Sequence, residues 1–173
     1  MALPARLIRE DYDGNPFLAE AYLGRSDFAL ASQLYFLFSR LSQLNLRRWP
    51  TGGSAVSDYG FCQDAIYAGI NLDGDDLAVY RRLAAGADML VKAPDVLIHL
   101  DAPVPVLMER IAERGRGYEK AFDANFVAAM RDRYAALTAE SAGPIITLDV
   151  SAVDLRTDPA VADVARAVRE KLR

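Results

Sequence analysis

The residues best suited to chemistry are polar groups that interrupt apolar segments. Gln33 and Arg40 lie seven residues apart, or two helical turns, in the apolar segment 27–47, so they share one face of a predicted helix. An arginine is costly to bury unless it is paired, and Asp64 is the candidate partner. These three side chains supply donors and acceptors suited to the edge of a nucleobase. A structural ion pair or an exposed stripe on the helix would explain the same residues without a ligand.

Acidic residues follow the predicted strands. Asp58 comes directly after residues 54–57, and an acid at the carboxyl end of a core strand commonly serves Mg²⁺ in phosphoryl-transfer enzymes. The same residue could instead be the N-cap of the helix expected from residue 61. In parallel α/β folds, ligands bind at the carboxyl ends of strands. The acids predicted at such ends are Glu10, Asp58, Asp101 and Asp149.

A basic segment follows the amphipathic pattern of residues 104–111. Arg110 and Arg114 are four residues apart and share a helix face, and Arg116 comes just beyond. Gly115 and Gly117 would let the chain turn back. Arginine forks fit phosphate oxygens, so this segment could be a lid that closes over a nucleotide. A solvated basic helix end, stabilised by the helix dipole, is the alternative.

The elements that must position these residues alternate between strands and helices. Residues 96–100 and 145–148 are short apolar runs, typical of strands covered on both faces. The alternation predicts an α/β fold with a parallel sheet. The predicted strands are residues 6–10, 54–57, 96–100 and 145–148, and the predicted helices are residues 16–22, 27–47, 61–69, 75–91, 104–111, 123–140 and 159–172.

Composition narrows the class of protein. A chain of 173 residues predicts a single domain over residues 1–173. Its net charge of −4 offers no broad basic field, which argues against a general nucleic-acid binder. One cysteine, Cys62, allows no internal disulfide and no zinc cluster. The start of the chain lacks a signal-peptide pattern, and no apolar run approaches the roughly 20 residues of a membrane helix. We therefore expect a cytoplasmic protein without a membrane partner.

Taken together, these residues resemble the deoxynucleoside kinase family, which includes deoxyadenosine, deoxyguanosine and deoxycytidine kinases. The resemblance runs from Glu10 to about Asp149 over five separated segments. Residues 10–18 look like the family's Glu-x-x-x-x-Asn-Pro-Phe-Leu segment, and residues 114–119 look like its Arg-Gly-Arg-x-x-Glu lid. The resemblance implies a P-loop kinase-like three-layer fold with a parallel sheet, and ATP and Mg²⁺ as cofactors.

The resemblance also implies roles in catalysis. Glu10 would be the general base that accepts the proton of the nucleoside 5′-hydroxyl, and Asp58 would serve Mg²⁺. The lid arginines would clamp the phosphates and adenine of ATP, and two of them would also stabilise the transferring charge. These lid residues are Arg110, Arg114 and Arg116, the last two being the catalytic pair.

For the nucleoside, the resemblance implies two groups of contacts. Tyr22 and Glu119 match the residues that hold the sugar 3′-hydroxyl. Gln33, Arg40 and Asp64 match the residues that read the base, and they suit purines and cytosine alike. The similarity to bacterial deoxypurine kinases favours deoxyadenosine or deoxyguanosine, and family analogy implies a homodimer.

Two features depart from the family pattern. Tyr59 follows Asp58 where the family often has an arginine that positions the reacting groups, although bacterial deoxypurine kinases often show a similar Asp-Tyr. No Gly-x-x-x-x-Gly-Lys-Ser/Thr loop occurs, so the family's N-terminal strand, P-loop and helix are missing. That strand is expected between the strands ending at Asp58 and Asp101, and its loss would expose two unpaired edges.

The sequence therefore predicts ATP-dependent phosphorylation of a deoxynucleoside. We expect that this sequence begins later than the family pattern because of truncation, a mis-assigned start or a split gene. The alternative is a non-catalytic nucleoside-binding protein, or a partner subunit of a competent kinase. Retention of Glu10 argues against this alternative, and the absent loop argues for it. A thymidylate kinase relative would need arginines for its monophosphate acceptor, which Tyr59 does not supply.

Overall fold

Two separate pairs of parallel strands organise the chain. In the computed structural model, which describes residues 5–49, 52–141 and 143–173, β1 (Ala5–Ile8) pairs with β2 (Ser54–Ser57). Likewise β3 (Leu97–Asp101) pairs with β4 (Ile145–Asp149). Each pair forms its own two-stranded sheet, and no ladder joins β2 to β3 within these described ranges.

The two sheets belong to different compact units. The N-terminal unit comprises Ala5–Ala93 together with the short segment Arg116–Ala121. The C-terminal unit comprises Pro94–Gly115 and Phe122–Arg173. The chain therefore leaves the C-terminal unit after Gly115, contributes six residues to the N-terminal unit, and returns.

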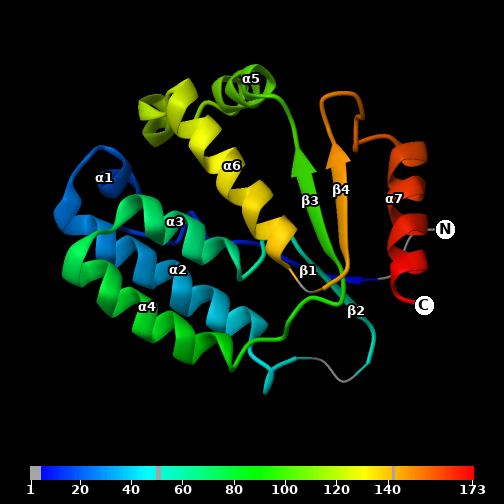
Figure 1. Cartoon of the computed structure of the whole chain (residues 1–173), viewed down its shortest axis with the longest axis horizontal. Helices are drawn as coiled ribbons and strands as arrows, with labels where there is room; N and C mark the ends of the chain where they lie inside the picture. The colour runs from blue at the N-terminus through cyan, green and yellow to red at the C-terminus, as the bar shows by residue number, and fades with distance from the viewer. Residues whose placement is uncertain (1–4, 50–51, 142) are drawn as a thin grey trace. The chain divides into compact units, whose positions relative to one another are not determined.

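In the N-terminal unit, three helices enclose the main apolar core. Leu37 and Tyr80 are almost fully buried in it, together with Ala68. The apolar segment predicted as a helix over residues 27–47 is the long helix α2, which packs against both α3 and α4 and so buries its apolar surface (Figure 1). The helical elements of this unit are α1 (Leu18–Tyr22), the 3₁₀ turn η1 (Ser26–Phe28), α2 (Ala29–Leu44), α3 (Gln63–Asn71), α4 (Gly74–Asp88) and the 3₁₀ turn η2 (Gly117–Ala121).

The described residues of the C-terminal unit form the helices α5 (Val104–Arg114), α6 (Ala124–Glu140) and α7 (Asp158–Lys171). Gly115 ends α5 in the left-handed region at φ 67°, a conformation that favours glycine. Asp123 caps α6, because its carboxylate accepts a hydrogen bond from the Phe126 amide at 2.8 Å. No helix in the part of the chain that the structure describes is long and apolar enough to cross a membrane.

The predicted α/β fold with parallel strand pairing is confirmed, and each predicted helix and strand is present with ends shifted by a few residues. Asp101 and Asp149 lie opposite each other at the ends of their strands, as the sequence predicted. The predicted single domain over residues 1–173 stays a prediction.

Candidate active site

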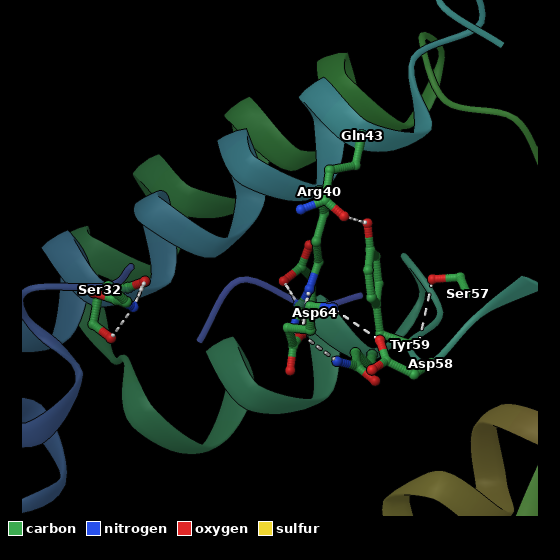
Figure 2. A network of polar contacts seen from close by, with 10 residues as sticks. Ser32, Arg40, Gln43, Ser57, Asp58, Tyr59 and Asp64 are labelled. Atoms are coloured by element: carbon green, nitrogen blue, oxygen red, sulfur yellow. Dashed lines mark hydrogen bonds and ion pairs between the residues drawn. The ribbon is translucent and has the colours of Figure 1, made fainter. Parts of the chain in front are cut away.

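A buried arginine joins two acidic residues from different elements. Arg40 lies in α2 and is 3% exposed, and Asp64 lies in the first turn of α3 and is 2% exposed. The Arg40 Nη1 atom donates a hydrogen bond to Asp64 Oδ1, as Figure 2 shows. The Arg40 Nε atom donates to Glu10 Oε1 at 2.9 Å, and Nη2 donates to the same oxygen. The predicted pairing of Arg40 with Asp64 is therefore confirmed, and Glu10 is a second partner.

Burial and the neighbouring arginine have opposite effects on the ionisation of Asp64. Burial raises the pKa of Asp64 to about 6, while the guanidinium of Arg40 acts in the opposite direction. Its second oxygen, Oδ2, is buried and has no hydrogen-bond partner in the described part of the chain. A buried acceptor without a donor is costly, so this oxygen is suited to receive a donor from a ligand.

Asp58 fixes the backbone next to Glu10. Its Oδ1 atom accepts a hydrogen bond from the Glu10 amide at 2.8 Å, and its own amide donates to the Ile8 carbonyl at 3.2 Å. The alternative that Asp58 caps the following helix is wrong, because α3 begins at Gln63 without a side-chain cap. The contact places the carboxylate of Asp58 beside the first residues after β1.

One carboxylate is enough for Mg²⁺ when phosphates and water supply the other oxygen ligands. Asp58 is exposed, and its Oδ2 atom takes part in no hydrogen bond with the described residues, so its chemistry fits the ion. Among those residues, no group of three or more His, Cys, Asp or Glu side chains could hold a metal alone.

A pocket of about 260 Å³ lies between α1 and the neighbouring helices of the N-terminal unit. Tyr22 and Gln33 both line it, so the structure brings together a predicted sugar contact and a predicted base contact. Asn71 and Ser32 also line it. Burial raises the pKa of Tyr22 well above its ordinary range, while a hydrogen bond with Asn71 acts in the opposite direction. The pocket thus offers a phenol, amides and a hydroxyl to a polar ligand.

Asn71 is a pocket residue that the sequence analysis missed. It lies seven residues after Asp64, which places both on one face of α3. The same spacing singled out Gln33 and Arg40 on α2. Applying that criterion to the next helix would have found Asn71.

The segment Arg116–Ala121 closes over this unit through aromatic contacts. The ring of Tyr118 stacks on Tyr22 with centroids 5.9 Å apart, and Arg116 lies 3.8 Å from the ring centroid of Tyr12. Arg116 Nη1 also pairs with Glu119 Oε1 at 3.4 Å, and Glu119 is 5% exposed. The two predicted sugar contacts, Tyr22 and Glu119, therefore belong to adjoining elements.

The predicted arginine cluster is divided between the two units. Arg110 and Arg114 lie on α5 in the C-terminal unit, and Arg116 belongs to the N-terminal unit. Arg110 Nη2 donates to the Val150 carbonyl at 2.6 Å, a contact within the C-terminal unit. A shared role of the three arginines on ATP stays a prediction.

The fold is that of a P-loop kinase-like α/β protein. The chain is similar to a deoxyadenosine kinase from M. mycoides with the products dCMP and dCDP bound, with a TM-score of 0.80 and 17% identity over 96% of this chain and 86% of that one. The same enzyme with bound dATP gives a TM-score of 0.77 at 17% identity, over 95% and 86% of the two chains. At this identity the likeness shows the fold alone.

The family follows from the sequence match. The sequence model described as "Deoxynucleoside kinase" matches residues 3–172, so this chain belongs to the deoxynucleoside kinase family. A deoxyguanosine kinase from Bacillus subtilis (strain 168) is 25% identical over 127 residues, which cover 70% of this chain and 60% of that protein. A deoxyguanosine kinase from Lactobacillus johnsonii is 29% identical over 121 residues, covering 64% and 53%. The chain thus spans between about half and three fifths of these two relatives.

Proposed function

We propose that this chain carries the nucleoside site and the catalytic base of a deoxynucleoside kinase. The reaction transfers the γ-phosphoryl group of ATP to the 5′-hydroxyl of a deoxynucleoside. The observation that carries the proposal is the buried Arg40, which joins Glu10 to Asp64 and so ties a candidate base to a residue suited to a nucleobase. Membership of the family and the names of the relatives support it.

In the proposed mechanism, Glu10 accepts the proton of the 5′-hydroxyl as the oxygen attacks the γ-phosphorus. The bond from the 5′-oxygen to phosphorus forms, the bond from phosphorus to the β-phosphate oxygen breaks, and ADP leaves. Mg²⁺ at Asp58 would neutralise charge on the phosphates. Arg114 and Arg116 are proposed to stabilise the transferring charge, and Arg110 to contact the nucleotide.

For the substrate, we propose a purine deoxynucleoside. Its base would meet Gln33, Arg40 and Asp64, and its 3′-hydroxyl would meet Tyr22 and Glu119. Relatives named as deoxyguanosine and deoxyadenosine kinases support the purine, although another relative from Bacillus subtilis is named as a deoxyadenosine/deoxycytidine kinase. A homodimer in the cytoplasm remains part of the proposal, and sedimentation velocity measures the assembly.

Calorimetry and a phosphorylation assay test this function on the purified chain. We expect deoxyadenosine or deoxyguanosine to bind more tightly than thymidine. Phosphorylation by Mg-ATP is measured on this chain and on a version extended by whatever is encoded upstream. Because this sequence contains no phosphate-cradling loop, we expect the 5′-monophosphate from the extended version only. Glu10→Gln should lower kcat by about 10²–10⁴-fold, the usual range for a lost general base, and leave nucleoside affinity within a few-fold. Nucleoside binding without any phosphorylation would favour the non-catalytic alternative. Absence of nucleoside binding would reject the proposal.

A further inference from the structure

Three N–H donors converge on a single oxygen of Glu10. The Oε1 atom accepts from Arg40 Nε at 2.9 Å, from Arg40 Nη2, and from Gln63 Nε2 at 3.0 Å. The other oxygen, Oε2, accepts from no residue within the described ranges. The side chain of Glu10 is 25% exposed, so this carboxylate is neither sealed in the core nor free in water.

The restraints on Glu10 come from separate elements. Arg40 lies on α2 and Gln63 begins α3, while Asp58, just after β2, holds the main-chain amide of Glu10. The main chain and one carboxylate oxygen are therefore both fixed. Tilting the carboxylate away from this arrangement would break the contacts at Oε1, whereas a half-turn only exchanges two equivalent oxygens. The place of the second oxygen is therefore set as well.

Arg40 is itself held rigidly. Its guanidinium lies 5.0 Å from the ring centroid of Phe36 and 5.5 Å from that of Tyr59, as expected for cation–π contacts. The hydroxyl of Tyr59 donates to Gln43 Oε1 at 2.9 Å, which anchors this ring (Figure 2). A planar guanidinium can present two N–H groups to Glu10 and a third to Asp64 at once, which the single ammonium of lysine cannot match.

We propose that Gln63 and Arg40 are positioning residues that saturate Oε1 of Glu10, so that Oε2 is the atom that takes the proton of the substrate hydroxyl. This inference rests on the proposed function and adds the orientation of the base. A purely structural ion pair is already complete with Arg40. The neutral amide of Gln63 adds no charge, and its effect is to select which oxygen is occupied.

The kinetic test compares two side-chain amide variants, both made in the extended version of the chain. Gln63→Leu removes a donor to Glu10, and Asn125→Leu makes a comparable change at an exposed side-chain amide on α6, in the C-terminal unit. We expect Gln63→Leu to lower kcat by about tenfold, as a misplaced base does, with the nucleoside KM and dissociation constant within twofold. Asn125→Leu should leave these quantities within twofold. An unchanged kcat in Gln63→Leu, or a loss confined to KM, would overturn the inference.

A second test reads the geometry without turnover. In ¹H–¹⁵N spectra, the side-chain amide signals of Gln63 are assigned by their loss in Gln63→Leu, and the Arg40 Nε–H signal by its loss in Arg40→Lys. Glu10→Ala should move both sets of signals and speed solvent exchange of the Arg40 Nε–H at least tenfold. If the Gln63 signals stay in place, the inference is wrong, whatever the activity. Failure of nucleoside binding in the unmodified chain, or of phosphorylation in its extended version, would instead reject the proposed function.

Discussion

The two units of the chain treat polar side chains differently. Every polar or charged residue that is buried in the described part of the chain lies in the N-terminal unit, namely Asn15, Ser32, Gln33, Arg40, Asp64 and Glu119. Among the described residues of the C-terminal unit, three ion pairs are more exposed than the Arg40–Asp64 pair. Arg131 and Asp101 are 39% and 28% exposed, and Arg166 and Asp163 are about two-thirds exposed.

The difference in buried polar groups between the two units is not explained by stability. A buried ion pair often gives no net stability, because desolvation offsets the attraction between its charges. A fold has little reason to collect such groups unless they bind something, and the C-terminal unit forms without them. Concentration of buried polar groups in the N-terminal unit therefore supports the proposal that this unit binds the ligand, as does the pocket at Tyr22 and Gln33.

The largest expected effect comes from one substitution made in each unit. Arg40→Met leaves Asp64 and Glu10 without their cation, and removing one partner of a buried pair costs about 3–5 kcal/mol. Arg131→Met breaks a more exposed pair and should cost much less. Urea unfolding followed by circular dichroism measures both.

Trp49 is the only tryptophan in the sequence and packs against the apolar cluster of Ile8, Leu44 and Tyr59, so its fluorescence reports unfolding of the N-terminal unit. We expect this signal to shift in Arg40→Met and to stay in place in Arg131→Met. Equal losses of stability in the two variants would contradict the contrast between the units.

The second effect is a dependence of stability on pH. Burial raises the pKa of Asp64 to about 6 from the model-peptide value of 3.8, so the folded chain keeps a proton that the unfolded chain has lost. Asp64 therefore makes stability fall as pH rises from about 4 to about 6, with no further loss above that window. Each pKa unit corresponds to about 1.4 kcal/mol, which sets an upper limit near 3 kcal/mol.

Asp64→Asn should remove this slope. Unfolding free energies of the two proteins are measured by urea titration from pH 4 to pH 7. As pH rises, the unmodified chain should lose stability relative to Asp64→Asn. Other acids contribute equally to both curves and cancel in the difference. Parallel curves would show that Asp64 ionises normally in the folded chain.

The third effect concerns the turn that follows Glu10. Asn15 is buried, its amide nitrogen donates to the Ser32 carbonyl and hydroxyl at 3.2 and 3.1 Å, and its oxygen accepts from the Phe17 amide at 3.0 Å. Asn15→Ala should cost about 2 kcal/mol, because it leaves buried groups unsatisfied. Ser151→Ala removes only an exposed hydrogen bond to Asp149 and should cost less than about 0.5 kcal/mol. Comparable losses of unfolding free energy in Asn15→Ala and Ser151→Ala would contradict the claim that buried polar groups matter more in the N-terminal unit.

Local patterns in the sequence were sufficient for the elements and for part of the site. The two-turn spacing of Gln33 and Arg40 placed them on one face of α2, and the structure buries both, so the alternative of an exposed stripe is wrong. The need to pair a buried arginine pointed to Asp64. Both inferences depend on periodicity and on the cost of burying charge, which act over short stretches of chain.

Other parts of the site depend on contacts that no local pattern contains. Arg40 reaches Glu10 from 30 residues away, and Gln63 reaches it from 53 residues away. Asp58 had two plausible roles from its position, and its actual contact is the backbone of Glu10. The assignment of Arg110 and Arg114 to one unit and Arg116 to the other likewise depends on tertiary contacts. The local sequence, a helix end followed by a turn, would be the same if all three arginines belonged to one unit.

The smallest expected effect compares two stacked aromatic pairs, one in each unit. Tyr118 stacks on Tyr22 at 5.9 Å and an interplanar angle of 14°, and Tyr134 stacks on His99 at 6.2 Å and 17°. Only the first pair includes a residue that lines the pocket. Such a pair contributes about 0.5–1.5 kcal/mol beyond its buried area. Tyr118→Leu should therefore weaken nucleoside binding by about two- to tenfold, because Tyr22 loses the ring that holds it.

Tyr134→Leu removes an equivalent contact from the C-terminal unit and should leave nucleoside affinity unchanged by calorimetry, even where it lowers thermal stability. If Tyr118→Leu binds nucleoside as tightly as the unmodified chain, the stacked pair packs the segment Arg116–Ala121 without shaping the pocket. If both variants weaken binding equally, the effect comes from general loss of stability. Weaker binding in Tyr118→Leu alone would identify the segment Arg116–Ala121 as part of the nucleoside site, because Tyr118 acts on the pocket through Tyr22.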